Sequence, residues 1–212
     1  MTEIRTTLIL VRHGECSANV EERFRGRCDF DLNDLGREQA QQLAGALQKL
    51  NPTALYSSPL RRAVQSLEPA SRLLGLGIGI EDGLNNLSFG AWEGRLKSEI
   101  AREQPDLWEL WRSSPEELAF PGMESLGEVA RRAKEALDRL VARHSGETVA
   151  LCTHRTVLKP LVPLCLGMTP PCFWKFHFDT ASISILMHDG RGYSLFSLNR
   201  IDHLTRLNRE WN

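Results

Sequence analysis

The sequence lacks a net charge of either sign and lacks any long hydrophobic run. Its 26 Lys and Arg nearly balance 27 Asp and Glu, which gives a formal net charge of -1. Such a chain has no global field that attracts nucleic acid or anionic membranes, so any anion site must be local. No apolar run approaches the roughly 18 residues that span a bilayer, and the N-terminal residues lack the apolar core of a signal peptide. We therefore expect no nucleic-acid partner and no membrane association.

Cysteine is sparse and is not arranged for a disulfide framework. The chain has five cysteines, an odd number, and none of them forms a CxxC pair. This usage fits a reducing compartment, so we expect a soluble, cytoplasmic protein. The sequence also contains no internal repeat, low-complexity tract or linker. A chain of 212 residues with 42% hydrophobic content can bury the core of one domain, and we expect residues 1–212 to form it.

Short apolar runs alternate with amphipathic segments along the chain. Three runs are typical of buried strands: 8–11, 54–57 and 148–153. Helical spacing or helix start signals mark four segments: 34–50, 59–74, 125–145 and 157–166. The glycine-rich segment 75–79 closes the second strand–helix unit, and two strands flanking residues 189–192 read as a β-hairpin. The order predicts an α/β fold, a three-layer α/β/α sandwich whose sheet is mainly parallel with at least one antiparallel strand.

Residues 81–123 differ from the rest of the chain because their periodicity is weak. This region holds short helical pieces and the tryptophans Trp92, Trp108 and Trp111. We expect it to be a cap-like insertion that covers a site from above.

Two strand ends and one helix start supply cations and imidazoles. Arg12 and His13 follow the first strand, Arg62 lies one helical turn past the second, and His154 follows a later one. Polar residues at strand ends are also common without any function, so the first pair alone decides little. The carboxyl ends of parallel strands meet at one edge of the sheet, which brings all four together. Guanidinium groups bind phosphate oxygens, and neighbouring cations keep an imidazole neutral and nucleophilic.

A metal site does not fit this constellation. The two histidines are potential ligands, but the two arginines beside them repel a divalent cation. No local spacing of histidine, cysteine and carboxylate residues supports metal binding either. We expect no metal.

Several motifs in order resemble those of the histidine phosphatase superfamily, which includes the cofactor-dependent phosphoglycerate mutases. The matching segments are Arg12-His13-Gly14-Glu15, Arg23-Phe24-Arg25-Gly26, Ser57-Ser58-Pro59-Leu60-Arg61-Arg62, Gly90-Ala91-Trp92-Glu93-Gly94 and Thr153-His154. They extend over nearly the whole chain, which makes coincidence improbable. Within the superfamily the chain is most similar to phosphatases of the α-ribazole phosphate and phosphoserine type.

The resemblance implies a role for each matching residue. His13 would be the nucleophile that becomes phosphorylated, while Arg12, Arg62 and His154 would bind the phosphoryl group and stabilise its charge. Asn19 would contact the bound phosphate, and Arg25 and Gly26 would line the substrate pocket. The substrate would be a small phosphorylated metabolite, and no cofactor would be needed.

Two positions depart from the family pattern. Asn86 stands where family phosphatases usually carry the carboxylic acid that protonates the leaving oxygen, and Arg155 stands where many relatives have glycine. An amide can bind the leaving group but cannot supply a proton. Three explanations stay open: a carboxyl of Glu15, Glu93 or Asp82 substitutes, the substrate has a good leaving group, or the protein is a weak enzyme.

The leading interpretation is a metal-independent phosphatase that acts through a phosphohistidine intermediate. One alternative is phosphoryl transfer of the phosphoglycerate mutase type, although the Glu-Arg-x-Tyr-Gly sequence of those mutases is absent. A second alternative is a weakly active phosphate-binding protein, which Asn86 motivates. Apolar residues near the C-terminus, 196–198, offer a surface for a homodimer.

Overall fold

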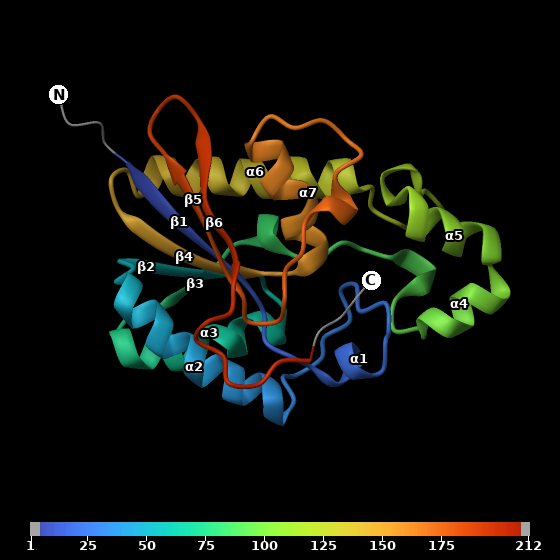
Figure 1. The fold of residues 1–212 in the computed structure, drawn as a ribbon, viewed down its shortest axis with the longest axis horizontal. Helices are drawn as coiled ribbons and strands as arrows, with labels where there is room; N and C mark the ends of the chain where they lie inside the picture. Colours follow the sequence, from blue (N-terminus) through green and yellow to red (C-terminus); the bar gives the residue numbers. More distant parts are fainter. Residues whose placement is uncertain (1–4, 209–212) are drawn as a thin grey trace.

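A computed structural model describes residues 5–208 and contains a single sheet flanked by helices (Figure 1). The strands are β1 (Thr6–Arg12), β2 (Ala54–Ser57), β3 (Ile78–Ile80), β4 (Thr148–Thr153), β5 (Ile183–His188) and β6 (Tyr193–Arg200). Their order across the sheet is β3-β2-β4-β1-β5-β6. The first four of these are mutually parallel, whereas β5 and β6 pair antiparallel. The predicted mixed α/β fold and the predicted hairpin are confirmed.

Seven α-helices and four short 3-10 turns complete the described part of the chain. The α-helices are α1 (Ser17–Val20), α2 (Asp34–Leu50), α3 (Arg61–Leu74), α4 (Lys97–Glu103), α5 (Pro105–Ser113), α6 (Leu126–Arg143) and α7 (Arg155–Cys165). The 3-10 turns are η1 (Asp82–Leu84), η2 (Gly90–Trp92), η3 (Pro115–Glu117) and η4 (Phe173–Lys175). No helix in the described range 5–208 is long and apolar enough to cross a membrane.

Strand β1 shows why the fold has three layers. Its side chains alternate between two separate hydrophobic clusters, with Leu8 and Leu10 in one and Ile9 and Val11 in the other. Since successive side chains of a strand point to opposite faces, both faces of β1 are covered. The first cluster is completed by α6 and α7 and the second by α2 and α3. These helix pairs lie above and below the sheet in Figure 1.

The glycine-rich segment 75–79, which was predicted to close the second strand–helix unit, is partly a strand. Residues 78–80 form β3, which pairs in parallel with β2 at the edge of the sheet. A Cβ on Gly79 would stand 2.7 Å from the ring of Tyr56, so a larger residue there would force that ring to move. A run of three residues with a central glycine is too short to produce a periodic signal.

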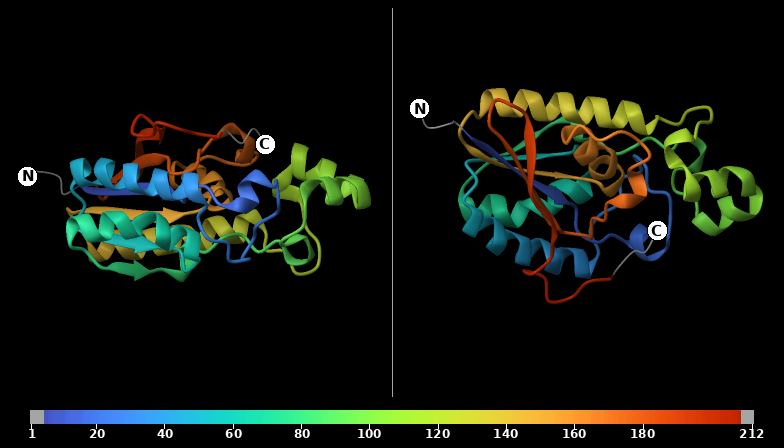
Figure 2. Two further views of the ribbon diagram at one scale, coloured as in Figure 1. Left: turned by 90° about the horizontal axis from the view of Figure 1, so that it is seen from below. Right: turned by 45° about the horizontal axis from the view of Figure 1, so that its top comes forward.

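Residues 81–123 form η1, η2, α4, α5 and η3. Helices α4 and α5 project beyond the sheet, at the end of the molecule opposite to the start of β1 (Figures 1 and 2). Strand β6 forms the edge of the sheet opposite to β3, and its residue Phe196 is 70% exposed.

Candidate active site

The pairing of β1 with β4 brings two imidazoles together. Arg12 and Thr153 are register partners at the ends of these parallel strands, so the residues that follow, His13 and His154, are neighbours. The backbone N–H of His13 donates to the carbonyl of Thr153 at 3.0 Å. The two imidazole ring centroids lie 5.1 Å apart. Arg62, the second residue of α3, is buried with them.

The geometry of His13 fixes its tautomer. Its Nδ1 lies 2.7 Å from the carbonyl oxygen of Gly14, and a carbonyl only accepts, so Nδ1 carries the proton. Burial lowers the pKa of the imidazole well below its ordinary value of 6.5, and the charges of Arg62, Arg12 and Arg25 lower it further. His13 is therefore neutral near pH 7, with an unprotonated Nε2. This is the state that a nucleophilic imidazole requires.

Backbone carbonyls accept hydrogen bonds from two buried guanidinium groups. Arg62 donates from Nη1 to Cys28 at 2.8 Å and from Nη2 to Gly26 at 2.9 Å, and Arg12 donates to Phe178 at 2.7 Å. Burial, followed by the charge of Arg25, lowers the pKa of Arg62 to about 10. Arg62 thus remains a cation at neutral pH. Carbonyls orient Arg62 without neutralising its charge, which leaves a field that attracts an anion.

His154 is oriented by Ser58, a residue that the sequence analysis did not single out for function. Ser58 Oγ lies 2.7 Å from His154 Nε2. The Nδ1 of His154 and the Nε of Arg62 are both buried without a hydrogen-bond partner among residues 5–208. Unpaired buried polar atoms are costly, and oxygens of a bound anion would satisfy them. The sequence feature that could have pointed to Ser58 is its place between β2 and Arg62, in the motif that leads into α3.

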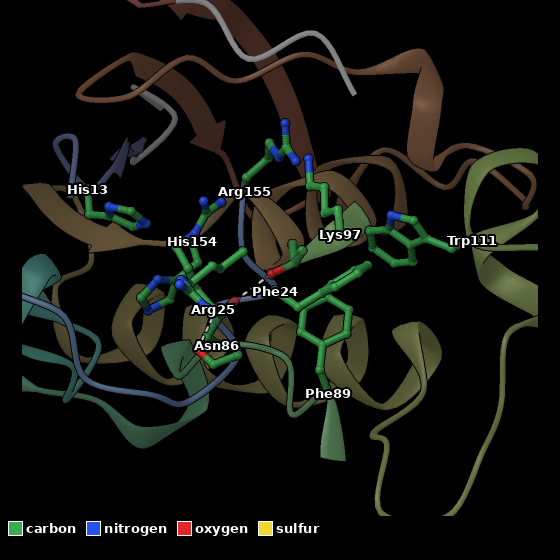
Figure 3. Close-up of a pocket in the computed structure, with 12 residues that line it drawn as sticks. His13, Phe24, Arg25, Asn86, Phe89, Lys97, Trp111, His154 and Arg155 are labelled. Atoms are coloured by element: carbon green, nitrogen blue, oxygen red, sulfur yellow. Dashed lines mark hydrogen bonds between the residues drawn. The ribbon is translucent and has the colours of Figure 1, made fainter. Parts of the chain in front are cut away.

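A pocket opens beside the two histidines (Figure 3). It is lined by His13, Arg23, Phe24, Arg25, Gly26, Asn86, Phe89, Lys97, Trp111, His154, Arg155 and Thr156. In the view of Figure 3 the histidines lie at one end and Trp111 at the other. Segment 81–123 contributes four of these side chains, those of Asn86, Phe89, Lys97 and Trp111.

The sequence-predicted residues are distributed unevenly over this pocket. His13, His154, Arg25, Gly26 and Asn86 line it, whereas Arg12, Arg62 and Asn19 do not. The Asn19 amide oxygen accepts from the backbone N–H and the thiol of Cys16, both at 2.9 Å, at the start of α1. Its expected direct contact with phosphate therefore has no support from the pocket lining. The aromatic side chains of Phe24 and Phe89, the cations Arg23 and Lys97, and Thr156 were not anticipated.

Asn86 is held in a fixed orientation. Its Nδ2 donates to the carbonyl of Gly26 at 2.8 Å, and its Oδ1 accepts a short hydrogen bond from the hydroxyl of Thr156. A side chain with both polar atoms engaged is positioned to contact a ligand with its remaining N–H. Asn86 thus presents an amide at the position where the resemblance leads us to expect an acid.

None of the three carboxyls expected to substitute for that acid lines the pocket. Glu15 accepts from Asn33 at 2.8 Å, and Glu93 accepts from the backbone N–H of Phe89 at 3.0 Å. Asp82 is exposed in η1. Among the described residues that line the pocket there is no carboxylate. The hypothesis of a substitute carboxyl therefore finds no support in the site.

Within residues 5–208 no group of three or more His, Cys, Asp or Glu side chains is arranged to hold a metal ion. The polar groups of the pocket are instead nitrogen donors, which suit an anion.

Comparison with known proteins agrees with the geometry. The family model of the histidine phosphatase superfamily (branch 1) matches residues 8–201. Phosphoserine phosphatase 1 of Hydrogenobacter thermophilus is 32% identical over 197 residues, which are 93% of each chain. A bifunctional protein of Mycobacterium tuberculosis is 35% identical over 181 residues. The present chain spans about half the length of that protein, since the match covers 50% of it.

Solved structures share the fold over nearly their whole length. Bacillus stearothermophilus YhfR has a TM-score of 0.89 and 31% identity, with 93% of this chain and 98% of that chain covered. An Escherichia coli structure described as a putative alpha-ribazole-5'-P phosphatase has a TM-score of 0.83 and 26% identity, with 92% and 96% covered.

Proposed function

We propose a reaction for this chain, which belongs to the histidine phosphatase superfamily: it hydrolyses a small phosphorylated metabolite through a phosphohistidine at His13. The observation that carries the proposal is the neutral His13 imidazole, whose Nε2 is unprotonated because burial and the charges of Arg62 and Arg12 lower its pKa. Phosphatases among the relatives support the same class of reaction. No cofactor or metal takes part in the proposed steps.

The reaction has two displacements. Nε2 of His13 attacks phosphorus, the bond from phosphorus to the leaving oxygen breaks, and the leaving group departs. Water then attacks the phosphohistidine, which releases inorganic phosphate and restores the imidazole. Arg12, Arg62 and His154 stabilise the negative charge on the transferred oxygens in both steps, and this positioning and electrostatics supply most of the catalysis.

The remaining residues give the pocket its selectivity. We assign Arg25, Gly26 and Asn86 to substrate binding, with Asn86 contacting the leaving group and Arg25 the anionic substrate. Segment 81–123 acts as a cap-like insertion within one domain, because its side chains form the outer part of the pocket. The proposal includes a cytoplasmic location, no nucleic-acid or membrane partner, and a homodimer formed through the exposed β6 edge around Phe196.

One observation favours a second candidate function. Since Asn86 cannot donate a proton, a phosphate-binding protein with very slow turnover would have the same pocket. It would bind phosphate and gain thermal stability from it, without releasing product.

Phosphate release from p-nitrophenyl phosphate separates these functions, because its leaving group scarcely needs protonation. We expect wild-type protein to release phosphate and His13→Ala to lose at least about 10³-fold in kcat/KM, as for removal of a nucleophile. Arg37→Ala, on the exposed surface of α2, controls for loss of charge elsewhere. Equal activity of wild type and His13→Ala would contradict the proposal. A phosphate-induced rise in Tm without turnover would support the binding protein.

A further inference from the structure

The pocket combines an amide in place of an acid with several cations. Asn86 is locked between Gly26 and Thr156, and Arg25, Lys97 and Arg155 line the same space. We propose that the substrate is one whose leaving group departs as a stable oxyanion, as in a phosphoanhydride or an acyl phosphate. This inference rests on the proposed phosphatase function and names the substrate class of that site.

A leaving oxygen can be stabilised either by a proton or by positive charge. The alkoxide of an alkyl ester is strongly basic and depends on a general acid, which is typically worth about 10²–10⁴-fold. A carboxylate or phosphate leaving group has a pKa of about 4 or 6 and leaves without a proton. Fixed cations and N–H donors are then sufficient to stabilise it.

The other polar groups of the lining are poor proton donors. Thr156 has an alcohol hydroxyl, and the arginine guanidinium groups do not titrate in proteins. Lys97 is an ammonium, and a lysine ammonium has a reference pKa of about 10.4, far above the neutral pH at which a general acid works best. Burial lowers the pKa of His154 well below 6.5, and Arg62 lowers it further, so its imidazole is neutral near pH 7. Asn86 itself donates one N–H to Gly26 and keeps a second for the leaving oxygen. The lining thus offers hydrogen bonds and charge rather than a proton.

The backbones of Arg155 and Lys97 are positioned by the starts of two helices. Arg155 directly follows His154 as the first residue of α7 and is only 6% exposed. Lys97 begins α4, and its N–H donates to the carbonyl of Glu22 at 3.0 Å. That hydrogen bond ties α4 to the loop that carries Arg25. Arg155, Lys97 and Arg25 therefore come from three different segments, and all three line the pocket (Figure 3).

An oxyanion leaving group accounts for both departures from the family pattern. Arg155 adds a cation where many relatives have glycine, and Asn86 removes an acid. A group that leaves with negative charge is stabilised by the added cation of Arg155. It does not need the acid that Asn86 replaces. A neutral alcohol leaving group gains nothing from Arg155 and loses its proton source at Asn86.

The test compares leaving groups on the full chain. We expect wild-type kcat/KM for acetyl phosphate and pyrophosphate to exceed that for phosphoserine by at least about 100-fold, the value of a missing general acid. Asn86→Glu restores an acid and should narrow this ratio at least tenfold, whereas the equally long amide of Asn86→Gln should not. Comparable wild-type rates on all three substrates, or the same narrowing by Glu and Gln, would overturn the inference.

A second pair of variants tests the cation and separates the inference from the proposed function. Arg155→Gln should raise KM for pyrophosphate at least tenfold more than KM for p-nitrophenyl phosphate. Arg102 is a cation on α4 whose side chain is 75% exposed, and Arg102→Gln should change neither of these two KM values. An equal effect of Arg155→Gln on both substrates would overturn the assignment. His13-dependent turnover of p-nitrophenyl phosphate tests the proposed function by itself. The absence of this turnover in wild-type protein would overturn both the proposed function and the inference that rests on it.

Discussion

Ser58 Oγ lies 2.7 Å from Nε2 of His154, and both residues are fully buried. The hydroxyl fixes the orientation of the imidazole, whose Nδ1 is buried without a hydrogen-bond partner among residues 5–208. Ser58 connects the end of β2 to the residue that follows β4. It is therefore a positioning residue rather than one that contacts substrate.

Ser58→Ala should lower kcat on p-nitrophenyl phosphate roughly fivefold, because a lost hydrogen bond of about 1 kcal/mol is about a factor of five in rate. Ser58→Thr, which keeps the hydroxyl, should retain most of the activity. Both variants should be compared by Tm, so that loss of fold is seen separately. Equal activity of Ser58→Ala and wild type would rule out the positioning role.

The pH dependence should report the electrostatics of His13. Burial first, and then the charges of Arg62, Arg12 and Arg25, lower the pKa of this imidazole below 6.5. Protonation removes the nucleophile, so the acidic limb of kcat/KM should lie below pH 6.5. Arg25→Ala removes one of these charges and raises the pKa, which moves the limb to higher pH. The measurement is the normalised kcat/KM profile of each variant on one substrate.

Arg37→Ala provides the control for this experiment, since Arg37 is exposed on α2 and is not among the charges that act on His13. Its profile should coincide with that of the wild type. A limb that stays in place in Arg25→Ala, or that moves to lower pH, would contradict the assignment of the pKa shift to Arg25.

Two glycines of α2 should respond in opposite ways to alanine. A Cβ on Gly36 would stand 1.9 Å from the carbonyl oxygen of Glu15, beside the catalytic loop, whereas a Cβ on Gly45 meets nothing within 4 Å. Gly36→Ala should therefore destabilise the fold by about 1–3 kcal/mol and reduce activity. Gly45→Ala should stabilise it by roughly 0.5–1 kcal/mol, because alanine favours the helix. Urea unfolding measures both, and stabilisation by Gly36→Ala would refute the close contact.

Much of the fold follows from patterns that are local in the sequence. The run of residues 8–11 is apolar at every position, which is the mark of a strand covered on both faces. The capping box of Ser125 and Glu128 marks the start of α6, and it is present in the structure. Strand β3 could not be predicted in this way, because its pairing with β2 and not its composition defines it.

The candidate site likewise has one part that local sequence patterns predict and one part that they do not. Arg12, His13 and His154 follow strand ends, so parallel pairing alone brings them to one edge of the sheet. The outer pocket depends on contacts between segments far apart in sequence. An example is the 2.9 Å hydrogen bond from the N–H of Phe24 to the carbonyl of Arg95. No periodicity encodes such a contact, which is why Lys97 and Thr156 were missed.

The central claim is that His13 carries the phosphoryl group. Wild-type protein should be mixed with p-nitrophenyl phosphate, quenched at alkaline pH within a turnover and analysed by mass spectrometry. The account predicts one added phosphoryl group, located on His13 among the six histidines of the chain and absent from His13→Ala. Phosphate release without any phosphorylated intermediate, or a phosphoryl group on another residue, would contradict it.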